Sequence, residues 1–438
     1  MKKKYLSEFA KYVTLNIMGM VGLSCYILAD TFFISKGLGS DGLTALNLAI
    51  PIYSFVHGIG LMFGMGGATK YSIFMGQKHK KEANEVFNNT VRAALVIAGI
   101  LSVTGIIFSK QIAVFLGADG AILSMSDIYL KFILLFAPAF ILNEILISFV
   151  RNDGNPGLAM TAMLGGSISN IILDYVFIFL LEWEMFGAVA ATSMAPLISM
   201  VVLSIHKIKG KQQFFLKKIR FSSKIALEIS SLGIPSLITE VAAGIVMIIF
   251  NMLILRIEGN VGVAAYGVIA NLALVFNAVY TGIAQGVQPL VSKGYGENNV
   301  IRIKTIYQYA LITVGLISGI IYGFCFFYAD PITAVFNSEQ NAVLQKIAVE
   351  GMKLYFTSVP FIGFNIVTSV FFSGIERAVP AQSISLLRGI ILMVPVAYLL
   401  ALTGGMTGIW LTVSVTEGIV SFIGMFFLMV WWKKAELY

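Results

Sequence analysis

The chain has 438 residues, of which 58% are hydrophobic and only 12% are charged, and its mean hydropathy is +0.87. Soluble domains carry roughly 25% charged residues, so the composition excludes a cytosolic enzyme, a nucleic-acid-binding protein with a basic groove and a disordered scaffold. The two cysteines and three histidines form neither a disulfide framework nor a metal-spaced pattern.

Apolar segments long enough to cross a bilayer recur along the whole chain. A transmembrane helix needs about 20 predominantly apolar residues. Twelve helices are predicted, over residues 10–35, 43–73, 91–108, 127–150, 158–181, 186–206, 225–256, 263–292, 304–327, 345–373, 380–402 and 406–432. The sequence therefore predicts an all-α integral membrane protein.

The basic residues predict how the chain is oriented. Of 30 Lys and Arg residues, 24 fall in the termini and in the connections that lie on the same side as the termini, and six fall on the other side. By the positive-inside rule, both termini are expected to be cytoplasmic in a multi-pass protein of the cell membrane. The net charge of +8 is then a topology signal, with anionic lipid as a secondary partner and no nucleic acid expected.

The first half of the sequence repeats in the second half. A shift of 220 residues aligns Gly39 with Gly259, and a later shift of 224 aligns Pro156 with Pro380. Because the repeat unit holds six helices, the two copies are parallel and are related by a pseudo-two-fold axis along the membrane normal.

The repeat predicts two six-helix lobes. The N-terminal lobe is expected over 1–206, a basic cytoplasmic linker over 207–224, and the C-terminal lobe over 225–438. Two lobes around a central site suit alternating access, in which one lobe rocks against the other. The alternative is a duplicated membrane scaffold without transport.

Polar residues inside the predicted helices indicate a site in the N-terminal lobe. Burying a charge at mid-bilayer costs at least about 2.5–3.5 kcal/mol. At 1.5 Å per residue, Asp30, Asp174 and Thr192 all lie roughly 9–11 Å below the outer edge of the bilayer. Asn170 is one helical turn from Asp174 and shares its face.

Two carboxylates, an amide and a hydroxyl at one depth fit a monovalent cation. A hard ion such as Na⁺ takes oxygen ligands, and these four side chains supply them. Alternatively, desolvation and mutual repulsion lead one of two adjacent carboxylates to bind a proton. A third interpretation is that each Asp is hydrogen-bonded to a neighbouring helix and has only a structural role.

The C-terminal lobe does not duplicate this set, because Asp30 aligns with Phe250 and Asp174 with Tyr398. Its candidate is Glu240, which lies mid-helix and is expected to bind a cationic substrate or a coupling proton. The alternative is that Glu240 pairs with Arg388.

Other polar residues in the helices receive weaker interpretations. No role is assigned to Glu144 or Glu417, and His57 is interpreted as a helix-packing residue, with a proton relay as the alternative. Four amides are further candidates for substrate binding, although packing alone is the default reading: Asn271, Asn277, Gln285 and Gln288.

Several motifs together resemble one transporter family. They are LADTFFISKGLGSDGLTALNLAIP at 28–51, GIAQGVQPLVSKGYGENN at 282–299, and FVRNDGNPGLAM at 149–160, which leads to SNIILDYVFIF at 169–179. With the twelve-helix duplication, they resemble the multidrug and toxic compound extrusion (MATE) transporters, and the last run resembles the MepA-type branch of Gram-positive bacteria.

The resemblance implies antiport of cationic, amphipathic drugs and dyes against Na⁺ or H⁺, without another cofactor and as a monomer. It also implies that Asp30, Asn170, Asp174 and Thr192 form the cation site. Another branch of the family uses an acidic residue at the position of Glu240 together with an Asp in the tenth helix. Residues 345–373 contain no Asp, so Glu240 is expected to contact substrate.

Two other functional classes fit the sequence less well. A lipid-linked oligosaccharide flippase of the same superfamily would need a cleft rich in Arg and Lys, whereas the ionisable residues in the predicted helices are mainly acidic. A membrane-embedded enzyme would need a nucleophile–base pair or metal-spaced His and Cys, and the sequence has neither.

Overall fold

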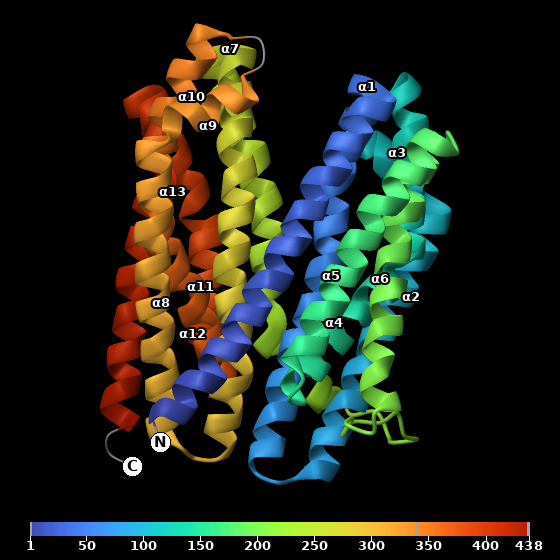
Figure 1. The fold of residues 1–438 in the computed structure, drawn as a ribbon, viewed down its shortest axis with the longest axis vertical. Coiled ribbons are helices and arrows are strands. Elements are labelled where there is room, and N and C mark those ends of the chain that lie inside the picture. Colours follow the sequence, from blue (N-terminus) through green and yellow to red (C-terminus); the bar gives the residue numbers. More distant parts are fainter. Residues whose placement is uncertain (1, 338–339, 436–438) are drawn as a thin grey trace. The chain divides into compact units, whose positions relative to one another are not determined.

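The computed structural model describes residues 2–337 and 340–435, which form helices and no strand (Figure 1). The helices are α1 (Lys2–Gly76), α2 (Lys80–Phe115), α3 (Gly120–Leu135), α4 (Ala137–Asn152), α5 (Pro156–Tyr175), η1 (Val176–Leu180), α6 (Glu184–Ile208), α7 (Ser223–Gly296), α8 (Val300–Phe327), α9 (Ala329–Phe336), α10 (Ala342–Tyr355), η2 (Phe356–Ser358), α11 (Val359–Gly374), α12 (Ala378–Leu386), η3 (Leu387–Ile391) and α13 (Met393–Ala435).

The described residues contain eight helical spans that are long and apolar enough to cross a membrane, and α3 with α4, bent by 48°, makes a ninth. Three spans have 74, 74 and 56 residues, more than twice the roughly 20 that one crossing needs. Each of the three is interrupted by a glycine with non-helical backbone, namely Gly39, Gly259 or Gly405. Each therefore corresponds to two of the predicted segments, and the all-α membrane fold is confirmed.

The breaks at Gly39 and Gly259 have the same geometry. Their φ and ψ angles are 67° and −155° in α1, and 63° and −156° in α7. A positive φ of this kind is accessible to glycine because it has no Cβ. The sequence repeat that aligns these two residues is thus matched in the backbone.

The beginning of α2 differs from its predicted boundary. The helix starts at Lys80, eleven residues before the apolar run at 91, and its first turns are polar. The side-chain oxygens of Asn84, Asn88 and Asn89 accept hydrogen bonds of 2.6–2.8 Å from backbone N–H groups of the basic linker. Hydropathy missed these turns because their partner is backbone and not lipid.

The chain forms two compact units. Unit 1 contains 1–13, 242–291 and 300–438, and unit 2 contains 14–241 and 292–299. Each unit thus includes a segment from the other half of the sequence. In unit 1, the beginning of α1 and the end of α13 lie toward the same end of the helices (Figure 1). The predicted division into lobes at the linker stays a prediction.

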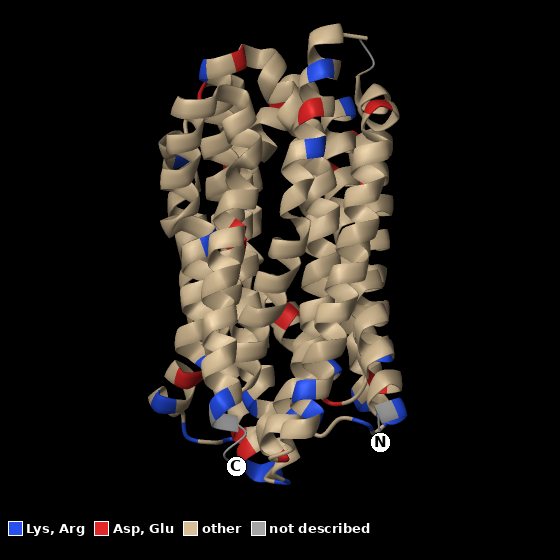
Figure 2. Ribbon diagram, turned by 90° about the vertical axis from the view of Figure 1, so that its left-hand side faces the viewer, with Lys and Arg blue, Asp and Glu red and all other residues tan. Residues whose placement is uncertain are grey.

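The exterior of the helices is apolar. Along α2, the side chains of Val96, Ile100, Val103 and Ile107 are exposed at helical spacing. Lys, Arg, Asp and Glu gather toward helix ends and connections, while the middle of the helices has few of them (Figure 2). An apolar surface of this kind is a membrane-contacting surface.

Candidate functional site

Three helices of unit 2 bring the four predicted cation-site residues together. Asp30 comes from α1, Asn170 and Asp174 from α5, and Thr192 from α6, and all four are buried. Since α5 presents Asn170 and Asp174 one turn apart, both reach the side of the helix that faces α1 and α6. Their role in binding the coupling ion stays a prediction.

Asn170 links Asp174 to α6. With the amide turned so that each end meets a complementary group, its nitrogen donates to Asp174 Oδ2 at 3.0 Å, and its oxygen accepts from the backbone N–H of Thr192 at 3.2 Å. The Thr192 hydroxyl donates within its own helix to the Ala188 carbonyl, at 3.1 Å. The amide therefore fixes one oxygen of Asp174 and leaves the other free for a different partner.

Each of the two carboxyl groups has one oxygen without a hydrogen-bond partner among the described residues. Asp30 Oδ1 and Asp174 Oδ1 are buried and accept no hydrogen bond from any residue that the structure describes. The two carboxyl groups lie close enough for one to donate to the other when a proton is present. A buried ionised carboxylate without a partner is very costly. The arrangement is therefore complete only with a bound cation or a proton.

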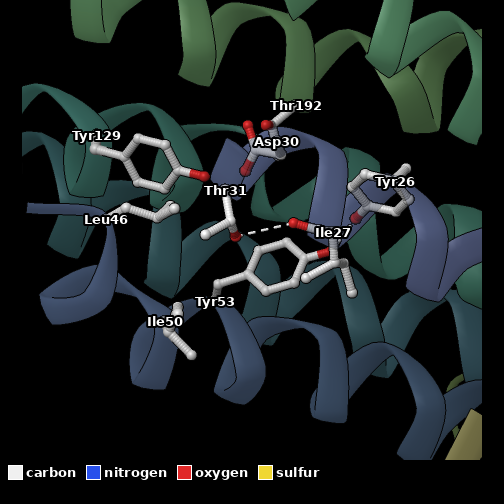
Figure 3. A pocket seen from close by; sticks show the side chains of 9 residues that line it. All are labelled: Tyr26, Ile27, Asp30, Thr31, Leu46, Ile50, Tyr53, Tyr129 and Thr192. Atoms are coloured by element: carbon white, nitrogen blue, oxygen red, sulfur yellow. Dashed lines mark hydrogen bonds between the residues drawn. The ribbon is translucent and has the colours of Figure 1, made fainter. Parts of the chain in front are cut away.

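A small cavity of about 50 Å³ opens beside Asp30 (Figure 3). It is lined by Tyr26, Ile27, Asp30, Thr31, Leu46, Ile50, Tyr53, Tyr129 and Thr192. A water molecule needs only about 10–15 Å³ of such space, so the cavity is large enough for an ion or a few waters. Its walls are apolar apart from hydroxyl and carboxyl oxygens.

Three tyrosines of the cavity were not predicted from the sequence. The hydroxyls of Tyr26 and Tyr53 are hydrogen-bonded to each other at 2.7 Å, and Tyr129 lines the cavity together with Thr192. Tyr26 is one turn from Asp30, at i−4, and this spacing was the one feature of the sequence that indicated a tyrosine beside Asp30. The tyrosine hydroxyls add neutral oxygen atoms to the carboxylate, amide and hydroxyl oxygens that are available to bind a cation.

The chemistry of this donor set favours a hard monovalent ion or a proton. Among the residues that the structure describes, no group of three or more His, Cys, Asp and Glu is arranged to hold a transition metal. Two carboxylates with amide and hydroxyl oxygens fit Na⁺, and the paired carboxylates alone fit a shared proton.

Glu240 lies in a second acidic group of unit 2. Its Oε2 is 3.5 Å from His57 Nδ1, and Glu144 Oε1 is 3.7 Å from His57 Nε2. The alternative that Glu240 pairs with Arg388 is wrong. The interpretation of His57 as a packing residue alone missed that the ring lies between two carboxylates.

Arg388 pairs with Glu417 within unit 1. Its Nη2 donates to Glu417 Oε1 at 2.6 Å, and Asn365 donates to Glu417 Oε2, also at 2.6 Å. Arg388 lies in the π-helical turn η3, and Glu417 is 2% exposed. Both carboxylate oxygens of Glu417 are satisfied by protein groups.

The predicted amide candidates belong to unit 1 and have different surroundings. Asn271 and Asn277 are exposed, whereas Gln285 and Gln288 are buried and have interaction partners. The buried pair and the two exposed asparagines thus differ in whether a solute can reach them, and their role in substrate binding stays a prediction.

Comparisons with known proteins agree on one kind of protein. The MatE family model matches residues 16–176 and 235–399. The Multidrug export protein MepA of Staphylococcus saprophyticus is 26% identical over 402 residues, which cover 91% of this chain and 88% of that protein.

Solved structures share the fold over nearly the full length. MATE in complex with MaL6 has a TM-score of 0.93 at 22% identity and covers 98% of this chain and 97% of its own. The outward-facing conformation of a multidrug resistance MATE family transporter of the MOP superfamily has a TM-score of 0.92 at 22% identity, with coverage of 98% and 96%.

Proposed function

The chain belongs to the MatE family of multi-pass membrane transporters, and on this basis we propose that it exports cationic, amphipathic drugs and dyes in exchange for Na⁺ or H⁺. It is a secondary transporter and not an enzyme. The observation that carries the proposal is the buried Asp30–Asp174 pair, in which each carboxyl group has an oxygen without a partner among the described residues and Asp30 lines a cavity of ionic size.

The coupling ion binds in unit 2. For Na⁺, the ligands are oxygens of Asp30, Asp174, Asn170 and Thr192, and Tyr129 lies within reach of Thr192. For H⁺, the two carboxyl groups share the proton, and Asn170 holds Asp174 in place by its hydrogen bond of 3.0 Å. Either ion removes the cost of burying two like charges.

The substrate is cationic because the exposed charged residue of the second acidic group, Glu240, carries a negative charge. The side chain of Glu240 is 30% exposed, so a solute can reach its carboxylate. Asn271 and Asn277 are the amides of the candidate set that a substrate can reach, whereas Gln285 and Gln288 are buried. The Arg388 side chain, which is 12% exposed, is neutralised by Glu417, which argues against a basic cleft for pyrophosphate and hence against a flippase.

Exchange follows from alternating access. The lobes predicted over 1–206 and 225–438 rock about the central site, with both termini in the cytoplasm and one chain as the working unit. Drug and ion bind preferentially to states that face opposite sides, and this difference in affinity couples their movements.

The test is transport by the full chain in liposomes. A Na⁺ gradient and a pH gradient are imposed separately, and movement of ethidium is followed by fluorescence. We expect one gradient to drive ethidium against its own gradient. Failure of both gradients to move ethidium would overturn the proposal.

A further inference from the structure

We propose that His57 is a resident cation of the substrate site: its imidazolium occupies the space between Glu144 and Glu240, and a cationic substrate binds Glu240 when the imidazolium releases its proton. The inference rests on the proposed function, because it assumes that Glu240 meets the cargo. It adds His57 and Glu144 as residues that determine affinity for cations.

The position of the ring between two acids is the first observation. Both ring nitrogens face a carboxylate oxygen, at 3.5 Å for Glu240 and 3.7 Å for Glu144. A neutral imidazole carries one N–H and can donate to only one acid, whereas an imidazolium carries two and can donate to both. The arrangement around the ring is therefore complementary to the protonated form.

Close helix packing holds the two acids against the ring. A Cβ added at Gly58 would lie 3.3 Å from the Cβ of Glu240, and one at Gly60 would lie 3.0 Å from the Cβ of Glu144. Glycine at both positions lets α4 and the first part of α7 approach α1 around His57. The carboxylates thus converge on the imidazole from two different helices.

The surroundings of the ring contain few other titratable groups. Tyr53, one turn earlier on α1, stacks on the imidazole with centroids 6.1 Å apart and planes 6° apart. Glu144 faces the ring from α4 and Glu240 faces it from α7. Through its hydroxyl, Tyr53 is also bonded to Tyr26 in the cavity beside Asp30. The ring is thus next to the coupling site but not part of it.

The exchange of the imidazolium proton for a monovalent organic cation leaves the net charge of the group unchanged. Two carboxylates and one imidazolium carry a net charge of −1, and two carboxylates, a neutral imidazole and one monovalent organic cation carry the same. The His57 and Glu144 side chains are 11% and 12% exposed, whereas that of Glu240 is 30% exposed. The substrate therefore approaches from the side of Glu240, and the proton leaves to water there.

The sign of the pH effect follows directly. At low pH the imidazolium competes with the substrate for Glu240, so affinity for a permanently charged cation falls. As pH rises through the titration of His57, the competitor is lost and affinity rises.

The experiment is equilibrium binding of tetraphenylphosphonium to the purified full chain from about pH 5.5 to about pH 8.5, the range in which histidine titrates. For wild type we expect binding about tenfold weaker at the acidic end, a typical coupling factor. For His57→Gln we expect a smaller difference in affinity between the two ends than in wild type. Equal pH dependence in wild type and His57→Gln would overturn the proposal.

Two further variants keep the test decisive. Glu144→Gln leaves the ring one carboxylate and should reduce the pH dependence even if His57→Gln does not fold. Asp30→Asn alters the coupling site and should keep the part of the pH dependence that depends on His57. Because binding is measured without a gradient, loss of gradient-driven transport with His57-dependent binding intact would contradict only the proposed antiport.

Discussion

Buried acids have opposite surroundings in the two units. In unit 1, Glu417 is bonded to Arg388 and Asn365 at 2.6 Å each. In unit 2, Asp30 and Asp174 each have a buried oxygen without a partner among the described residues. Burial alone therefore does not identify a functional carboxylate, and what distinguishes the two regions is whether the protein supplies the counter-charge.

The energetics of the two arrangements differ accordingly. Glu417 has a permanent counter-ion in Arg388. Removing one partner of such an ion pair strongly destabilises the protein, because the other charge is left unpaired. Under the proposed function, the pair in unit 2 binds a cation or a proton that can come and go. The account thus gives buried acids a structural role in one unit and an ion-coupling role in the other.

The largest expected effect is on transport through unit 2. Asp30→Asn and Asp174→Asn should each lower gradient-driven ethidium transport by at least about tenfold, because the amide cannot provide the negative charge that holds the ion. Transport in liposomes under the driving gradient measures this. The matched control is Glu182→Gln, which removes an exposed acid of the same unit and should leave transport unchanged. Wild-type rates in both Asp variants would remove these residues from the coupling role.

The next effect is on stability through unit 1. Glu417→Gln leaves Arg388 as a buried charge without its acid and should lower the free energy of unfolding by about 3–5 kcal/mol. Denaturation in mixed micelles measures the change.

The double variant Glu417→Gln with Arg388→Met is the control, since it removes both charges and should recover most of the stability. If the double variant is no more stable than Glu417→Gln alone, the ion pair is not the cause of the loss.

A smaller effect is expected for the affinity of the substrate site. Glu240→Gln should weaken tetraphenylphosphonium binding by about tenfold at neutral pH, because the exposed carboxylate is lost. Binding of an uncharged dye is the control and should not change. Equal weakening for both ligands would indicate a change in pocket shape and would contradict the electrostatic account.

The smallest effect concerns the tyrosine link between the two groups of unit 2. Tyr53→Phe keeps the ring that stacks on His57 but removes the 2.7 Å bond to Tyr26. Stability should fall by about 1 kcal/mol, the usual net value of one hydrogen bond, as measured by thermal unfolding. A loss of stability as large as that of Glu417→Gln would show that the Tyr53 hydroxyl makes further stabilising interactions besides this hydrogen bond.

Much of the fold was predictable because lipid imposes a simple rule on sequence. Length and apolarity predicted the helical segments, and the repeat predicted that Gly39 and Gly259 correspond, as their equal backbone angles confirm. The polar first turns of α2 were missed because their asparagines are buried by hydrogen bonds to the linker. Hydropathy has no measure of a backbone partner distant in sequence.

The candidate site was predictable where depth along helices determines proximity. Equal depth and helical spacing were sufficient to group Asp30, Asn170, Asp174 and Thr192, which the structure brings together. Depth does not give the rotation of a helix about its axis. The sequence therefore indicated neither that His57 lies between Glu144 and Glu240 nor that Arg388 pairs with Glu417.

The most direct test of the account is the release of the coupling ion when a drug binds. Purified protein in weakly buffered detergent is mixed with tetraphenylphosphonium, and released H⁺ or preloaded radioactive Na⁺ is counted for each drug molecule bound. Measured in a His57→Gln background, which removes the proton that the imidazolium releases, the account predicts release from protein with both Asp residues and from protein with the added double variant Glu417→Gln and Arg388→Met. It predicts no release when Asp30→Asn or Asp174→Asn is added. Unchanged release from both Asp variants, or its loss in the unit 1 double variant alone, would contradict it.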